Sequence, residues 1–192
     1  MVLPPRILIA LLPLVLGSVF VFAPTSVYGE TDEFTEAEYK VKAAFLLNFL
    51  RFIDFPNITG DYITVCVYGS IPQPAFESIR GRVIAGREIR TVFKPTGEDL
   101  GQCRVVFLSR TVDKELGRFL GQARGRGVLT VGEVENFCEK GGGIRFYLER
   151  SKVRFEVNLE GVKREGIRIS SNMLRLARTV SYTHLRAHET NV

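Results

Sequence analysis

Histidine and tryptophan are scarce in this 192-residue sequence. Trp is absent, and the two histidines, His184 and His188, both lie close to the C-terminus. Residues 30–180 therefore lack the commonest general base of enzymes. A Ser-His-Asp or Cys-His arrangement cannot form there, and neither can the usual catalytic zinc site, which nearly always uses His. These absences argue against an enzyme, and we expect no cofactor and no metal.

Acidic residues are missing from residues 1–29. This segment has one positive charge, Arg6, followed by an apolar run over residues 7–23 and small residues at the two positions that a signal peptidase reads. The pattern predicts a secretory signal peptide that is cleaved before Glu30. The alternative is an uncleaved membrane anchor, but the run is near the lower length for a span, and a proline and a glycine interrupt it.

The last twelve residues, "SYTHLRAHETNV" (181–192), differ in composition from the apolar, arginine-rich segment before them. The four-residue spacing of His184 and His188 could be interpreted as a metal pair on a helix. The segment instead resembles translated adapter or vector sequence. We interpret it as a foreign tail, which leaves residues 30–180 as the folded domain.

The remaining composition is that of an ordinary packed domain. Hydrophobic residues make up 45% and charged residues 24%, and the formal net charge is +5, or +4 once Arg6 is removed with the signal peptide. One soluble domain fits this length. So mild a positive charge predicts a solvated surface and no nucleic-acid partner.

Apolar runs separated by turn residues give the order of elements. A capping-box spacing predicts a helix from near Thr35 that stops before Pro56. Strands are predicted at residues 61–70, 87–95, 102–110 and 127–133, and helices at 72–81, 111–125 and 133–140. This rhythm predicts a single three-layer α/β domain with a largely parallel central sheet and flanking helices.

The C-terminal part changes to strict alternation. Residues 143–149 and 152–158 alternate apolar with polar side chains, which predicts an antiparallel hairpin joined at Arg150-Ser151. Two short helices are expected after it. The three glycines Gly141–Gly143 follow a predicted helix and precede a strand, the reverse of a phosphate-binding loop, so we interpret them as a structural connection.

Four stretches resemble the YfiR-like family of exported bacterial proteins. They are "EYKVKAAFLLNFLRFIDFP", "ITVCVYGSIP", "GVLTVGEVENFCEKGGGIRF" and "VRFEVNLEGVKREGIRISSNMLRLAR". The resemblance covers nearly all of residues 36–180. It implies a periplasmic repressor that holds the periplasmic part of a membrane-bound diguanylate cyclase inactive, and whose release promotes cyclic di-GMP synthesis and biofilm growth. It brings no catalytic residues.

The resemblance also bears on how the three cysteines pair. Cys66 and Cys103 match the usual bridge of the family, and they lie on strands that are often neighbours in a doubly wound sheet; the alternative is three separate thiols. Some relatives have a second pair near Cys138, but this sequence offers no nearby partner. Cys138 is therefore either a buried thiol or an intermolecular link.

Two surfaces are candidates for binding. The first helix is rich in Phe and Leu, so Phe45 and Phe49 are candidate contacts with the partner or with a second copy in a homodimer; the alternative is that both faces of the helix are buried. A small-ligand receptor would instead use the carboxyl ends of the strands. The residues there are Tyr68, Ser70, Ser109 and Arg110, and the alternative for them is ordinary loop chemistry.

An enzyme is the third hypothesis. Carboxylates such as Asp113, Glu133 and Glu135 are present, but the sequence gives no reason to place any two of them at a working distance. The partner, the releasing signal and the oligomeric state do not follow from the sequence.

Overall fold

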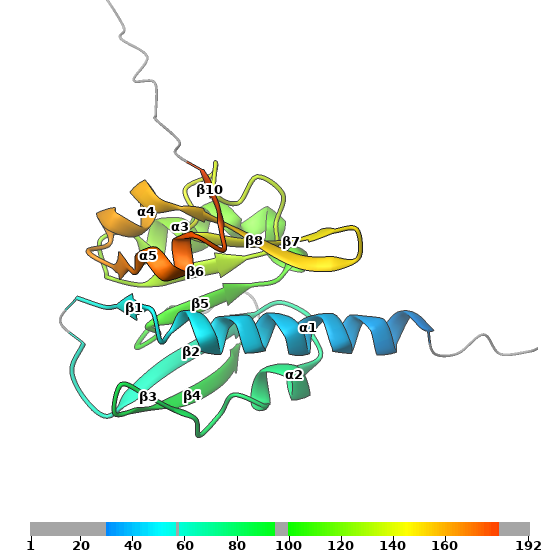
Figure 1. Ribbon diagram of the computed structural model, residues 1–192, viewed down its shortest axis with the longest axis horizontal. Helices are drawn as coiled ribbons and strands as arrows, with labels where there is room; N and C mark the ends of the chain where they lie inside the picture. Colours follow the sequence, from blue (N-terminus) through cyan, green and yellow to red (C-terminus); the bar gives the residue numbers. More distant parts are fainter. Residues whose placement is uncertain (1–29, 57, 95–99, 181–192) are drawn as a thin grey trace, which may run out of the picture.

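The computed structural model describes residues 30–180, except residue 57 and residues 95–99 (Figure 1). The predictions of a signal peptide over residues 1–29 and of a foreign tail over residues 181–192 fall outside the described residues. None of the helices in the described part of the chain has the length and apolar character that crossing a bilayer requires.

The centre of the fold is an eight-stranded, mostly parallel sheet. In order across the sheet the strands are β10 (Arg178–Val180), β8 (Lys152–Asn158), β7 (Ile144–Glu149), β6 (Leu129–Gly132), β5 (Val105–Leu108), β2 (Tyr62–Tyr68), β4 (Arg87–Lys94) and β3 (Val83–Ile84). The pairs β7–β8 and β3–β4 are antiparallel and the other pairs are parallel. The predicted α/β class with a C-terminal antiparallel hairpin is confirmed.

Helices cover both faces of this sheet. One core cluster contains residues of α1 (Glu30–Phe49), α2 (Gln73–Glu77) and α5 (Ser171–Leu174), and a second contains residues of the 3₁₀ helix η1 (Arg110–Glu115) and α3 (Leu116–Ala123). A further short helix, α4 (Leu159–Arg164), follows β8. Successive side chains of β2 alternate between the two clusters, because side chains of a strand point to opposite faces. Val65 and Val67 belong to the first cluster, and Cys66 and Tyr68 to the second.

The first helix differs from its predicted bounds. It begins at Glu30 and ends at Phe49, several residues before Pro56. The chain then forms β1 (Ile53–Asp54), which pairs with β9 (Arg168–Ile169) in a small antiparallel sheet. The helix therefore ends where the chain turns to pair with β9, a strand more than a hundred residues away in the sequence. The local sequence does not reveal this pairing.

The predicted helix at residues 133–140 is wrong. This segment is a series of turns that carries the ring of Phe137 into the core. A Cβ atom at Gly142 would lie 2.1 Å from that ring, and one at Gly132 would lie 2.4 Å from it. These two glycines therefore make room for Phe137, and the interpretation of the glycine run as a structural connection holds without the helix.

The predicted hairpin is present. Ile144 pairs with Val157, Phe146 with Phe155 and Leu148 with Val153. At the turn Arg150 and Ser151 have φ of 49° and 59°, as in the type I′ turns whose twist suits a two-residue hairpin.

Candidate functional site

The order of the strands reverses between β2 and β5. The chain passes from β2 to β4 on one side and then returns to β5 on the other side of β2. Ligands of open α/β sheets bind at the carboxyl ends of strands where such a reversal occurs. A pocket lies at this place, lined by residues that follow β2 (Ser70, Ile71, Pro72), that follow β5 (Arg110, Thr111) and that belong to α1 (Glu38, Tyr39).

Of the four predicted crevice residues, Ser70 and Arg110 line this pocket. Ser109 is buried, and its hydroxyl caps η1 by accepting a hydrogen bond from the Thr111 N–H. The prediction for Tyr68 is wrong: its ring is fully buried and packs on Phe119, with the ring centroids 4.6 Å apart. The alternation of side chains along β2 turns Tyr68 toward α3, away from α1 and the pocket.

Hydrogen bonds hold the ends of β2 and β5 together below the pocket. The Ser70 N–H donates to the Thr111 hydroxyl over 2.9 Å, and this hydroxyl lies 2.7 Å from that of Ser109. Gly69 has φ of +90°, and a Cβ there would lie 2.2 Å from the Ser109 hydroxyl oxygen. The polar groups in this part of the crevice form hydrogen bonds with one another, which favours the alternative that they belong to an ordinary loop.

A buried ionic cluster borders the pocket. The Lys42 ammonium donates to Oε1 of Glu38, one helical turn earlier in α1, and to Oε2 of Glu133, which follows β6. The side chains of Lys42, Glu38 and Glu133 are 2%, 6% and 3% exposed. Charged groups are buried at so low an exposure where partners compensate the loss of water.

Tyr39 and Arg110 complete the cluster. The Tyr39 hydroxyl donates to Oε1 of Glu133 over 2.7 Å, and Nη2 of Arg110 lies 3.0 Å from Glu38 Oε1 and 3.2 Å from Glu133 Oε2. Burial, together with the charge of Glu133 and the hydrogen bond to it, raises the pKa of Tyr39 well above its ordinary value. Tyr39 therefore remains a protonated donor. The Arg110 side chain is 58% exposed and forms the outer rim.

This arrangement is suited to structure and recognition. Two carboxylates face two cations, so the cluster is formally neutral, and it joins α1 to the carboxyl ends of β5 and β6. The other two carboxylates of the enzyme hypothesis lie on the surface: Asp113 pairs with Lys140 over 3.3 Å, and Glu135 is exposed. Within the described ranges no group of three or more His, Cys, Asp or Glu residues could hold a metal.

Sequence reasoning missed Glu38, Tyr39 and Lys42. The available signal was the four-residue spacing of Glu38 and Lys42 on a helix that is otherwise rich in apolar residues. Such pairs usually lie on a solvated face, and the partner Glu133 is 91 residues away from Lys42 in the sequence.

The two phenylalanines proposed as surface contacts lie in an aromatic cluster. Phe49 is 3% exposed, and its ring centroid lies 5.7 Å from that of Phe146 and 4.6 Å from that of Phe155. Phe45 is partly buried against the same two rings, at 6.2 and 5.8 Å. In the single chain Phe49 has no free surface to offer a partner, so its position favours the core alternative.

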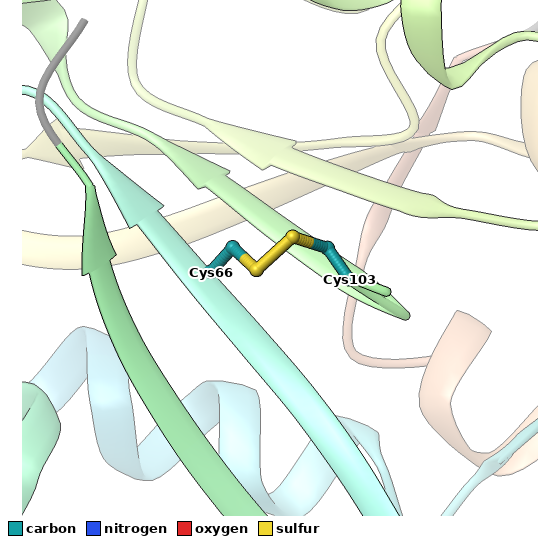
Figure 2. The surroundings of a disulfide bond; sticks show 2 residues. All are labelled: Cys66 and Cys103. Atoms are coloured by element: carbon teal, nitrogen blue, oxygen red, sulfur yellow. A yellow bond between two sulfur atoms is a disulfide. The ribbon is translucent and has the colours of Figure 1, made fainter. Parts of the chain in front are cut away.

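Cys66 and Cys103 form a disulfide, as the resemblance implied (Figure 2). It links β2 to the residues just before β5, with the two Cα atoms 5.7 Å apart. Cys138 is a free thiol with no exposed surface. Burial raises the pKa of this thiol, with a contribution from the charge of Glu156. Both features favour the buried-thiol alternative over an intermolecular link.

The family model described as DUF4154, YfiR/HmsC-like, matches residues 39–178. The matched range includes the strands β1 to β9, the first residue of β10, the disulfide and most of the ionic cluster, and it covers well over half of the chain. The chain belongs to the YfiR/HmsC-like family. This is a regulatory, non-catalytic family, known in the periplasmic regulation of diguanylate cyclases.

Proposed function

We propose that the protein is a periplasmic regulatory binding protein that represses a membrane-bound diguanylate cyclase by protein–protein contact and has no catalytic activity of its own. The observation that carries this proposal is the family match over residues 39–178. Two features of the chain support it. Residues 30–180 lack histidine, and the carboxylates that the fold brings together, Glu38 and Glu133, are occupied by Lys42 and Arg110.

Deletion of the gene tests this function. Cellular cyclic di-GMP should rise in the deletion strain and return to its original level when the gene is restored. Deletion of the regulated cyclase in the same strain should abolish the rise, and this identifies the partner. The purified protein should then bind the purified periplasmic segment of that cyclase in calorimetry. An unchanged cyclic di-GMP level, together with no binding to the periplasmic segment of any membrane cyclase of the organism, would contradict the proposal.

A second function is a receptor for a small carboxylate ligand at the carboxyl ends of β2 and β5. The supporting observation is the pocket beside Arg110, whose side chain is 58% exposed and whose hydrogen bonds to Glu38 and Glu133 are made by Nη2. An arginine fork suits a carboxylate. A panel of small carboxylates should raise the melting temperature of the wild type and leave that of Arg110→Gln unchanged. A panel that shifts neither protein would contradict the receptor hypothesis.

A further inference from the structure

One stripe of α1 changes abruptly in side-chain size. Residues four apart lie on the same face of a helix, and the stripe facing the β7–β8 hairpin consists of Ala37, Val41, Phe45 and Phe49. The two phenylalanines fill the space above the cross-strand pair Phe146–Phe155. Toward the start of α1 the stripe continues with side chains that are much shorter.

A groove results where the stripe becomes small. On the same face of the hairpin, the next cross-strand pair toward the tip is Leu148–Val153, and Ala37 and Val41 leave it partly uncovered. The groove is lined by Ala37, Glu38, Val41, Leu148, Ser151, Lys152 and Val153. Val41 remains 44% exposed and Leu148 42% exposed. In Figure 1 the hairpin tip and the first turns of α1 extend at the same end of the molecule.

The tip beside this groove carries cations. Arg150 and Lys152 are exposed and form no ion pair among the described residues, and Glu149, the cross-strand neighbour of Lys152, pairs with Arg154 over 3.6 Å. Arg150 and Ser151 also hold φ values of 49° and 59°, a conformation that Asn or Gly adopts with less strain. An arginine at such a position is strained, and strain of this kind is found at functional sites.

The strand next to the groove has a free edge. β10 pairs with β8 over Glu156–Asn158, and within the described sheet nothing pairs with the outer edge of residues 152–155. An exposed edge offers unpaired backbone N–H and C=O groups to an extended segment of another chain.

We propose that this groove is the surface that holds the partner protein, and that its occupant is a segment with a large apolar side chain flanked by acidic residues. The apolar side chain fills the space above Leu148 and Val153, and the acidic residues pair with Arg150 and Lys152. This inference rests on the proposed repressor function, and it places the contact at the middle of α1 (Ala37 and Val41) and at the hairpin tip, in place of Phe45 and Phe49.

Leu148→Glu tests the groove, and Val83→Glu is its control. Val83 is 65% exposed and lies on β3, at the opposite edge of the sheet. The probe is the purified periplasmic segment of the cyclase that the deletion experiment identifies. Leu148→Glu should weaken its binding by roughly tenfold or more and raise cellular cyclic di-GMP, with an unchanged melting temperature. Val83→Glu should behave as the wild type in all three measurements.

A second variant fills the groove from within. Ala37→Phe should keep or raise the melting temperature and still weaken binding, because the new ring takes the space of the partner side chain. If the wild type binds and both Leu148→Glu and Ala37→Phe bind equally well, the groove assignment is wrong and the repressor function stands. If the wild type neither binds nor represses, the repressor function itself fails.

Two further outcomes would assign the groove to another occupant and overturn the proposal. One is binding of the wild type, but not of Leu148→Glu, to vesicles of anionic phospholipid in the absence of the cyclase segment. The other is a dimer of the wild type in sedimentation that Leu148→Glu converts to a monomer without loss of binding to the cyclase segment.

Discussion

Replacement of Lys42 by Met removes the central cation of the buried cluster. The ammonium of Lys42 contacts both Glu38 and Glu133, and all three side chains are at most 6% exposed. Met has nearly the same length and fits the same space, so the variant isolates the loss of charge. Two carboxylates then remain inside the protein, with Arg110 as their nearest cation.

The expected loss is large for a single substitution. Breaking a buried ion pair by removing one partner costs about 3–5 kcal/mol, because the remaining charge is left uncompensated. Arg110 keeps a contact with both carboxylates, but at 58% exposure its pairs are screened by water. We therefore expect the lower limit, about 3 kcal/mol of unfolding free energy. For a domain of this size that corresponds to a fall in melting temperature of roughly 6–12 °C.

Urea unfolding followed by far-UV circular dichroism measures this effect, since the protein has no Trp for fluorescence. Lys40→Met is the matched control: Lys40 pairs with Glu36 over 2.7 Å at side-chain exposures of 58% and 42%. Loss of such an exposed pair should cost at most about 0.5 kcal/mol.

A Lys42→Met protein within about 1 kcal/mol of the wild type would refute this reasoning, because the carboxylates would then need no compensation. A triple variant that also carries Glu38→Gln and Glu133→Gln gives a second check. It removes the uncompensated charges and should recover most of the lost stability. Failure of this recovery would show that the length and packing of Lys42, and not its charge, stabilise the fold.

Four further predictions concern other buried groups. Because burial raises the pKa of Tyr39, the unfolded chain loses the hydroxyl proton at a lower pH than the folded protein does, so the unfolding free energy should decline above pH 10 by up to about 1.4 kcal/mol per pH unit. Tyr39→Phe should remove this part of the decline, and an equal pH dependence of the unfolding free energy in the wild type and the variant would contradict it. Cys66→Ser opens a bridge that spans 37 residues and should lower the unfolding free energy by about 4 kcal/mol in urea, whereas an unchanged midpoint would argue against the bridge. Iodoacetamide should modify Cys138 only in urea, because the thiol is buried and protonated in the native protein. Mass spectrometry measures the modification, and rapid labelling of the native protein would disprove the burial of Cys138. Gly142→Ala places a Cβ atom 2.1 Å from the Phe137 ring and should cost about 1–3 kcal/mol in thermal unfolding, and a variant as stable as the wild type would show that the ring can move.

Local patterns in the sequence were sufficient for much of the fold. The apolar runs at β2, β5 and β6 and the alternation of the β7–β8 hairpin are signals of period and composition that act over a few residues. The resemblance implied the Cys66–Cys103 pair, and the parallel pairing of β2 with β5 brings these two residues together. The crevice at the strand ends followed from the general rule for α/β sheets, and Ser70 and Arg110 line it.

The predictions that failed depend on contacts between distant residues. α1 ends at Phe49 because the following residues pair with β9. Residues 133–140 form turns because the ring of Phe137 packs against two glycines. Tyr68 faces away from the pocket because of the way the side chains of β2 alternate between the two faces of the sheet. A run that is apolar at every position does not reveal which side chain points to which face.

The amino-acid sequence was sufficient to predict the class of the protein: an α/β domain without histidine in residues 30–180 and with the motifs of a regulatory family. The use of its charges and apolar surfaces depends on the tertiary fold. Glu38 and Lys42 could belong to a solvated helix face until the fold places Glu133, from the end of β6, beside them. Likewise, the small side chains of Ala37 and Val41 become a groove only because the hairpin lies opposite them. Local patterns specify elements, whereas burial and electrostatic pairing depend on which distant residues the topology brings into contact.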